Sequence, residues 1–172
     1  MAFKLLELLE GGAVPEHITR HMKAVSKLAV NLGMLLNIRG GCELNLSDIE
    51  LAALLHDMRR AEANHAAAAA AVISDAGGAR IAEIVRQHML PDKAERDNIS
   101  EITVLYIADK MADGERVISI EERYAKRLKD SPLGPRRRAA EYNLGVAMAI
   151  KGRMEELIGE KITPELLSNE PV

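Results

Sequence analysis

Apolar residues recur every three or four positions through most of the chain, which is the spacing of one face of an α-helix. Alternation of apolar and polar residues, the pattern of a half-buried strand, is hard to find. Glycine, proline and short polar runs divide the helical pattern into segments. The expected helices cover about residues 3–9, 15–37, 47–58, 65–75, 79–89 and 136–158, with one over 102–112 that continues after a bend near Gly114 to 128, and a short turn or helix after Thr163. The pattern predicts an all-α fold, a compact bundle of many helices.

The organisation of the chain indicates one domain. The length of 172 residues suits a single hydrophobic core, and we find no internal repeat or long linker. We expect residues 1–172 to form one domain whose motif-bearing core spans about 15–128. The helices of 132–172 either pack on that core or form an oligomer contact, which makes a homodimer possible. Within the core, Ser47 and Glu50 have the spacing of a capping box, which predicts a helix start.

The composition argues against several classes of protein. The chain has 23 Lys and Arg against 26 Asp and Glu, a net charge of −3, and only 2% aromatic residues. We therefore expect no partner among nucleic acid duplexes, and we interpret the run 136–138 of three arginines as a solvated helix start. No apolar run reaches the roughly 20 residues of a membrane helix, and Lys4 and Glu7 interrupt the segment 3–9. With Cys42 as its only cysteine, the chain suits a reducing compartment, and we expect a cytoplasmic protein without a membrane partner.

Several titratable side chains fall where the helical pattern places core side chains. His21, His65, His88 and Asp109 each share a helix face with apolar residues in projection. A buried carboxylate without a partner is costly, and one metal ion would compensate several such groups at once. The adjacent pair His56-Asp57 closes another helix and adds a second carboxylate. Imidazole and carboxylate together suit a divalent ion of the Mn, Fe, Co, Ni or Zn type.

Each of these residues also has a separate explanation. A lone histidine on an apolar face is usually a satisfied core residue, and Asp109 alone could pair with Lys110 or Arg116. His56 could lie exposed at a helix C-terminus, where the helix dipole favours a cation. A single shared metal site is the simpler explanation, because it accounts for residues on four different helices together. His17 projects toward the edge of its apolar face, and we expect it to matter less than His21.

The order of His21, then His56-Asp57, then Asp109 resembles the signature of the HD-domain superfamily of metal-dependent phosphohydrolases. The contexts Leu51-Ala52-Ala53-Leu54-Leu55-His56-Asp57 and Tyr106-Ile107-Ala108-Asp109-Lys110 are similar as well. The resemblance covers about residues 15–128 and is to small single-domain bacterial or archaeal members. Two features depart from it: Arg59 stands where glycine is common, and His65 follows Asp57 after only eight residues. The Gly-Tyr-Pro signature of the cyclic-di-GMP phosphodiesterase branch is absent, which argues against that substrate.

The resemblance implies an HD-domain-like bundle with a metal site in its helical core. His21, His56, Asp57 and Asp109 would hold a divalent ion, with Asp57 as the catalytic residue that bridges two ions or orients the attacking water. His65 and His88 would be ligands of a second ion or would bind substrate phosphate. The cofactor is therefore one or two divalent ions per chain, and we favour two. Mn, Fe, Co, Ni, Mg and Zn remain open as its identity.

The resemblance also implies hydrolysis of a phosphomonoester, phosphodiester or phosphoanhydride of a nucleotide or another small phosphorylated metabolite. Substrate phosphate needs cations besides the metal, and we expect Arg60, Lys110 and Arg116 to supply them. Arg60 follows the His-Asp pair closely, and Arg116 lies seven residues after Asp109 on the same projected helix face. The alternative function is a non-catalytic metal- or nucleotide-binding regulatory module that has kept the fold.

Overall fold

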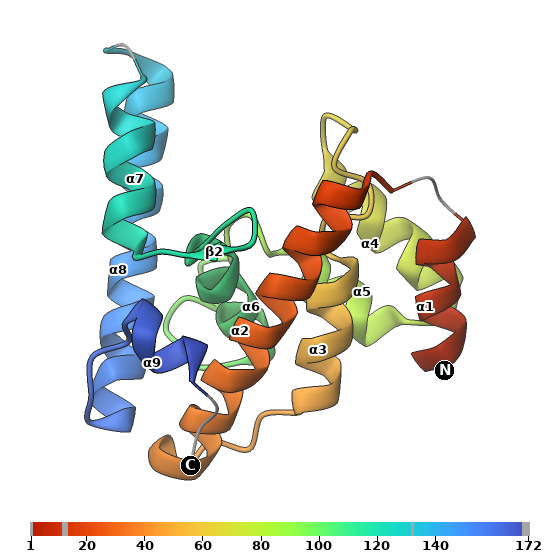
Figure 1. Ribbon diagram of the computed structural model, residues 1–172, viewed down its shortest axis with the longest axis horizontal. Coiled ribbons are helices and arrows are strands. Elements are labelled where there is room, and N and C mark those ends of the chain that lie inside the picture. Colours follow the sequence, from red (N-terminus) through yellow and green to blue (C-terminus); the bar gives the residue numbers. More distant parts are fainter. Residues whose placement is uncertain (1, 12–13, 132, 170–172) are drawn as a thin grey trace.

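Helices make up most of the described chain, which comprises residues 2–11, 14–131 and 133–169 of this computed structural model (Figure 1). The helices are α1 (Ala2–Gly11), α2 (Glu16–Gly40), α3 (Leu46–Leu55), α4 (His65–Asp75), α5 (Ala79–Arg86), α6 (Glu101–Lys110), α7 (Ile120–Lys129), α8 (Pro135–Ile158) and α9 (Pro164–Ser168). A small hairpin of β1 (Ala112–Asp113) and β2 (Arg116–Val117) separates α6 from α7. The all-α prediction is confirmed, and α4, α8 and α9 begin within a residue of their expected positions.

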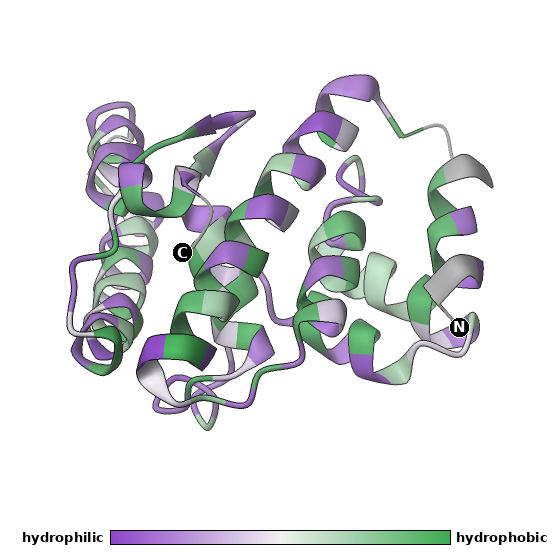
Figure 2. Ribbon diagram, turned by 60° about the horizontal axis from the view of Figure 1, so that its bottom comes forward, coloured by the Kyte–Doolittle hydropathy of each residue, from purple (hydrophilic) through white to green (hydrophobic). Residues whose placement is uncertain are grey.

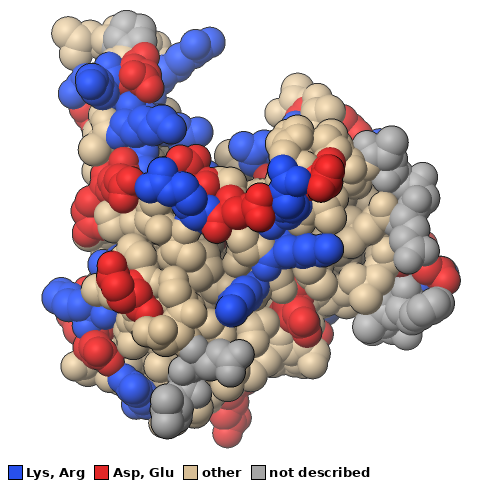
Figure 3. Space-filling model, in the orientation of Figure 1, with Lys and Arg blue, Asp and Glu red and all other residues tan. Residues whose placement is uncertain are grey.

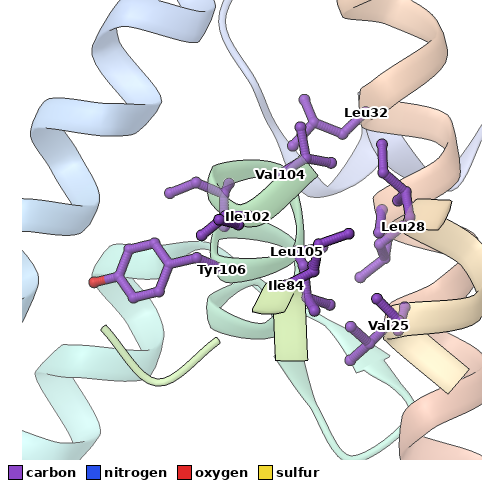
Figure 4. Packing of buried hydrophobic residues seen from close by; sticks show 14 of the residues in the cluster. Val25, Leu28, Leu32, Ile84, Ile102, Val104, Leu105 and Tyr106 are labelled. Carbon is purple, nitrogen blue, oxygen red and sulfur yellow. The ribbon is translucent and has the colours of Figure 1, made fainter. Parts of the chain in front are cut away.

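Helix α6 lies at the centre of the helical core, and every residue from Ile102 to Lys110 is buried. It contacts α2, α3, α5 and α8. Leu105 points toward Leu28 and Val25 of α2, whereas Tyr106 points to the opposite side (Figure 4). The hydroxyl of Tyr106 donates a hydrogen bond to the carbonyl of Asn143 on α8 at 3.3 Å. Each such apolar side chain contributes about 1.5–3 kcal/mol of burial free energy, so α6 is the element that holds the others together.

Helix α2 is the longest element and presents one apolar face to α6 (Figure 2). The apolar face predicted for this helix, Ile18, Val25, Leu28 and Leu32 with His21 among them, is buried except at Ile18, which is half-buried. The helix extends three residues beyond the expected end and stops at Gly41, whose φ of 66° is readily adopted only by glycine.

Helix α3 starts differently from the prediction, and of the apolar face expected there, Leu51, Leu54, Leu55 and Met58, only Leu55 is fully buried. Asn45, rather than Ser47, caps the helix, and its side chain accepts a hydrogen bond from the Asp48 N–H at 3.1 Å. The small residues Ala52 and Ala53 are completely buried, while Leu51 and Leu54 are only half-buried. The residue that follows on the alanine face is His56, and the fold therefore carries this histidine into the core.

The expected continuation of α6 through a bend near Gly114 is wrong. The chain instead reverses in the β1–β2 hairpin, where Ala112 pairs with Val117 and Asp113 with Arg116. Gly114 has a φ of 63°, a left-handed conformation that breaks the helix. Helix α7 then starts afresh at the cap Ser119, whose side chain accepts from the Glu122 N–H at 3.0 Å.

The C-terminal helices pack on the motif-bearing part of the chain. Helix α8 contacts α7, α2 and α6, and α9 contacts α2, where the Asn31 side chain donates to the Leu167 carbonyl at 2.8 Å. In Figure 1, α7 and the first half of α8 run side by side as an arm that extends beyond the other helices. Among the described residues, no helix has the length and apolar character needed to cross a membrane.

A buried carboxylate fixes the end of α8 to the segment that follows. Oε1 of Glu155 lies 2.8 Å from Nζ of Lys151 and accepts from the Ile162 N–H at 2.9 Å, while Oε2 lies 3.0 Å from Nζ of Lys161. Burial raises the pKa of Glu155, but these three donors outweigh it, so the net shift is downward. The ionised carboxylate thus stabilises the turn that leads into α9.

We predict that Glu155→Gln lowers the free energy of unfolding by about 1–2 kcal/mol at pH 7, because a hydrogen-bonded charge is lost. A carboxyl group whose pKa is depressed by folding stabilises the protein fully above the unfolded-state pKa of about 4.3, and the contribution is lost as the pH falls through the folded-state pKa. Urea unfolding of both proteins at pH 7 and pH 3 measures this, with the exposed Glu156→Gln as control. An equal difference at both pH values would contradict the prediction.

Candidate metal centre

Six titratable residues from five parts of the chain meet in the core. They are His21 of α2, His56 and Asp57 directly after α3, His65 at the start of α4, His88 after α5 and Asp109 near the end of α6. All are buried except His65, which is half-buried. The structure therefore brings together every residue that the sequence analysis named as a metal ligand, in groups that could hold a metal ion.

Asp57 lies at the middle of this cluster and faces two sets of ligands. Its Oδ2 lies 3.8 Å from Nε2 of His21 and 3.6 Å from Nε2 of His56. Its Oδ1 lies 3.3 Å from Nε2 of His65 and 3.5 Å from Nε2 of His88. The two oxygens of one carboxylate thus serve two groups of donors, which is the arrangement of a bridging ligand.

Asp109 completes the first of these two groups. Its Oδ1 lies 3.4 Å from Nε2 of His21 and 3.8 Å from Nε2 of His56. The first group then consists of two imidazoles and two carboxylates, and the second of two imidazoles and the shared Asp57. Both combinations of nitrogen and oxygen donors suit divalent transition metals.

Backbone carbonyls orient three of the histidines. Nδ1 of His56 donates to the carbonyl of Ala53 at 2.7 Å, and Nδ1 of His88 donates to the carbonyl of Val85 at 2.8 Å. Nδ1 of His21 donates to the carbonyl of Gly114 at 2.9 Å, across the β-hairpin turn. A carbonyl only accepts, so Nδ1 carries the proton in each ring. The neutral ring then presents the lone pair of Nε2 to the centre, as a metal ligand requires.

The pKa shifts of His56, His65 and Asp57 favour the charge states of a ligand set. Burial works against the charged form of His21, but its hydrogen bonds to Asp109 and to the Gly114 carbonyl outweigh it and raise its pKa. Burial lowers the pKa of His56 to about 4, helped by the neighbouring His88, so His56 is neutral at pH 7. Burial also lowers the pKa of His65. Burial works against the ionised form of Asp57, but the imidazoles of His88 and His56 and the Arg60 guanidinium outweigh it and hold its pKa below the usual range. The carboxylate is therefore ionised and the nearby imidazole is ready to coordinate.

The cluster fits a metal because its inward-facing atoms lack other partners. In the described part of the chain, seven buried side-chain nitrogen or oxygen atoms have no hydrogen-bond partner. Five of them belong to this cluster: Nε2 of His56, His65 and His88, and Oδ1 of Asp57 and Asp109. Buried polar atoms are rarely left unpaired, and lone pairs that face one another at this separation are stabilised by a cation between them.

Lys110 takes a different place from the one expected for a phosphate ligand. Its side chain is 5% exposed, and Nζ lies 2.6 Å from Oδ2 of Asp109. Nζ also donates to the His88 carbonyl at 3.4 Å and lies 4.9 Å from the ring centre of Tyr106. The structure therefore favours the alternative in which Lys110 pairs with Asp109. With Oδ2 held by Lys110, only Oδ1 of Asp109 faces the ligand cluster.

Arg60 and a residue that the sequence analysis missed, Arg123, lie where solvent reaches the centre. A hollow of about 380 Å³ is lined on one side by Asp57, Arg60, Pro15, Ile18 and Met58. A second hollow of about 280 Å³ has a lining that includes His21, Asp57, Arg60, Arg123, Asp113 and Glu115. Nη1 of Arg60 lies 2.7 Å from Oδ2 of Asp57, and half of its side chain is exposed.

Arg123 reaches the second hollow from α7. Its Nη1 donates to the carbonyl of Asp109 at 2.9 Å and to that of Ala112. No local pattern marks it in the sequence, because only the hairpin reversal brings α7 back over the end of α6.

The prediction that Arg116 lies on the same helix face as Asp109 is wrong, because Arg116 lies on β2. Its side chain is 75% exposed and faces Glu122, with Nη2 and Oε1 separated by 3.8 Å. It lines neither of the two hollows. His17, by contrast, is exposed at the edge of α2 and lines both, in agreement with its expected place outside the ligand set.

Comparison with known protein families identifies the class. The family model described as HD domain matches residues 18–114, more than half of the chain and the whole segment from His21 to Asp109. The chain therefore belongs to the HD-domain family. The comparisons with curated proteins and with solved structures find no match.

We predict that the protein binds two divalent ions per chain at saturation, because the two oxygens of Asp57 face separate donor groups. Metal analysis after equilibrium dialysis against Mn²⁺ should give a plateau of two for the wild type and one for His65→Ala or His88→Ala. His17→Ala, which alters an exposed residue outside the cluster, should still bind two. A wild-type plateau of one would contradict the prediction and leave His65 and His88 as phosphate ligands.

We predict that Lys110→Met weakens metal binding by about tenfold to a hundredfold, the usual effect of removing a group that orients a ligand. The variant releases Oδ2 of Asp109, so the carboxylate can turn away from the centre. Titration with Mn²⁺ followed by electron paramagnetic resonance measures the affinity, and thermal unfolding checks the fold. Lys126→Met, which alters an exposed lysine, is the control. Unchanged affinity in a folded Lys110→Met protein would show that Lys110 has no such role.

Proposed function

We propose that this protein is a divalent-metal-dependent phosphohydrolase that acts on a nucleotide or another small phosphorylated metabolite. The observation that carries the proposal is the set of five unpartnered ligand atoms directed at one another beside an arginine that is half exposed to solvent. Membership of the HD-domain family supports the same conclusion. A purely structural cluster would have its buried polar atoms paired with each other.

The six residues of the cluster could hold a divalent ion, and neighbouring groups of the chain orient them. A divalent ion held by these residues would activate water near neutral pH and neutralise charge that develops on phosphoryl oxygens. Asp57 directs one carboxylate oxygen toward each of the two donor groups. Lys110 fixes the orientation of Asp109, and the backbone carbonyls at Ala53 and Val85 fix the rings of His56 and His88.

Arg60 is the residue best placed to bind the substrate phosphate. Its guanidinium lies between the two hollows, and its planar array of donors suits phosphate oxygens. The larger hollow has Pro15, Ile18 and Met58 on its walls and suits the organic part of the substrate. The smaller one is lined by Asp113 and Glu115 as well as Arg123 and suits hydroxyl groups of a sugar. This division favours a nucleotide or sugar phosphate over inorganic polyphosphate.

We predict that the protein, once loaded with Mn²⁺ or Fe²⁺, releases phosphate or nucleoside from members of a panel of phosphomonoesters, phosphodiesters and phosphoanhydrides. Asp57→Ala should lose essentially all of this activity and most of the bound metal, because both donor groups share that carboxylate. Metal analysis and product assays on the same samples test both effects. A protein that binds metal but cleaves nothing would instead favour the regulatory module that the sequence left open.

We predict that Arg60→Gln lowers kcat/KM about tenfold to a hundredfold with the metal content unchanged, because a charge-assisted bond to phosphate is lost while no metal ligand is removed. Arg116→Gln tests the second arginine that the sequence singled out. Its exposed position on β2 leads us to expect a much smaller effect. A loss of metal from Arg60→Gln, or equal losses of kcat/KM in both variants, would contradict the assignment of Arg60.

A further inference from the structure

We propose that a pocket between the two helices of the α7–α8 arm binds a small phosphate-bearing anion. This pocket has a volume of about 300 Å³ and lies between the end of α7, the first turns of α8 and Met89. It shares no lining residue with the two hollows beside the metal centre. Binding there requires neither a metal nor hydrolysis, so the inference goes beyond the proposed function and stands apart from it.

The hollow arises from the small residues of α8. Arg136, Ala139, Ala140 and Asn143 follow one another at helical spacing, and all four line the pocket. The two alanines leave space between the longer side chains at either end. Arg127 and Ser131 close the pocket from the end of α7. Two guanidinium groups, a hydroxyl and an amide therefore surround a space whose floor is apolar.

The two arginines of this pocket have no acidic partner among the described residues. Neither Arg127 nor Arg136 forms an ion pair there; the Arg127 guanidinium lies 6.0 Å from the ring centre of Tyr124. Several other arginines are paired with a carboxylate, as Arg137 is with Glu141 at 3.0 Å. No carboxylate lines the pocket. Two neighbouring guanidinium groups without a counter-charge are a site for an anion.

The surrounding arm strengthens the positive potential of the pocket. Residues 126–138 contain six Lys and Arg against the single Asp130, although the net charge of the whole chain is −3. Blue side chains accordingly gather over the arm in Figure 3. A space of this size, at the small end of ligand pockets, accommodates a phosphate or diphosphate group rather than a polymer. Planar guanidinium forks bind the oxygens of such groups in pairs.

Calorimetric titration of pyrophosphate into the full-length protein with Asp57→Ala and Arg60→Gln tests the proposal, since the two changes remove the metal ligand and the phosphate-binding arginine of the other site. We expect one pyrophosphate per chain, and binding at least about tenfold weaker after Arg127→Gln with Arg136→Gln. Arg138→Gln changes an exposed arginine of the same helix outside the pocket and should bind as before. Side-chain nitrogen resonances of Arg127 and Arg136 should shift in the wild type as well, which keeps the test valid if Asp57→Ala folds poorly.

Three results would overturn the proposal: no binding up to about 10 mM pyrophosphate, binding that Arg127→Gln with Arg136→Gln leaves unchanged, or binding weakened equally by Arg138→Gln. The phosphate group can belong to a separate ligand or to a distant part of the substrate. Unchanged kcat/KM of the metal-loaded protein with only Arg127→Gln and Arg136→Gln would indicate a separate ligand, and a lowered value the substrate. Failure of hydrolysis in the wild type would contradict the proposed function only, because pyrophosphate binding is measured without it.

Discussion

Charge compensation inside the core is the constraint on which the rest of this structure depends. Two ionised carboxylates and four imidazoles lie where water does not reach freely, and the lone pairs of several of them face one another. Such a cluster is unfavourable unless cations lie among its members. Lys110 supplies one positive charge against Asp109 and Arg60 supplies another against Asp57, each through a single carboxylate oxygen. Among the described residues, Oδ1 of both carboxylates and Nε2 of His56, His65 and His88 have no hydrogen-bond partner, and a divalent ion would compensate them.

The buried helix α6 fixes the position of the ligand Asp109 within an apolar surrounding. All of its residues from Ile102 onward are buried, so Asp109 cannot reach water by a change of rotamer. Packing of Leu105 against α2 and of Tyr106 toward α8 fixes the helix on opposite sides (Figure 4). The rigid frame holds the carboxylate in place, and the binding of a metal need not include the cost of ordering it.

Much of the ligand set could be predicted from the sequence, because each ligand interrupts a helical apolar face or follows one directly. Helix period places His21 among Val25 and Leu28 whatever the tertiary fold is. The period does not decide which face of α3 is buried, since Ala52 and Ala53 look weaker than the leucines beside them and yet face the core. The sequence likewise could not predict a β-hairpin after α6, because a strand of two residues has no periodicity. For that reason the sequence named Arg116, which lies away from the centre, and missed Arg123, which lies beside it.

The acceptors that orient His21, His56 and His88 are all main-chain carbonyls. A substitution at Ala53, Val85 or Gly114 changes a side chain but leaves the acceptor oxygen in the chain. A substitution at these positions acts on the ring only through the backbone, because Ala53 and Val85 are buried and Gly114 has a left-handed φ of 63° that favours glycine. An insertion or deletion in the hairpin would move the carbonyl that holds His21 while every ligand remained in the sequence. The centre therefore depends on the length and the path of the hairpin as well as on the identity of its ligands.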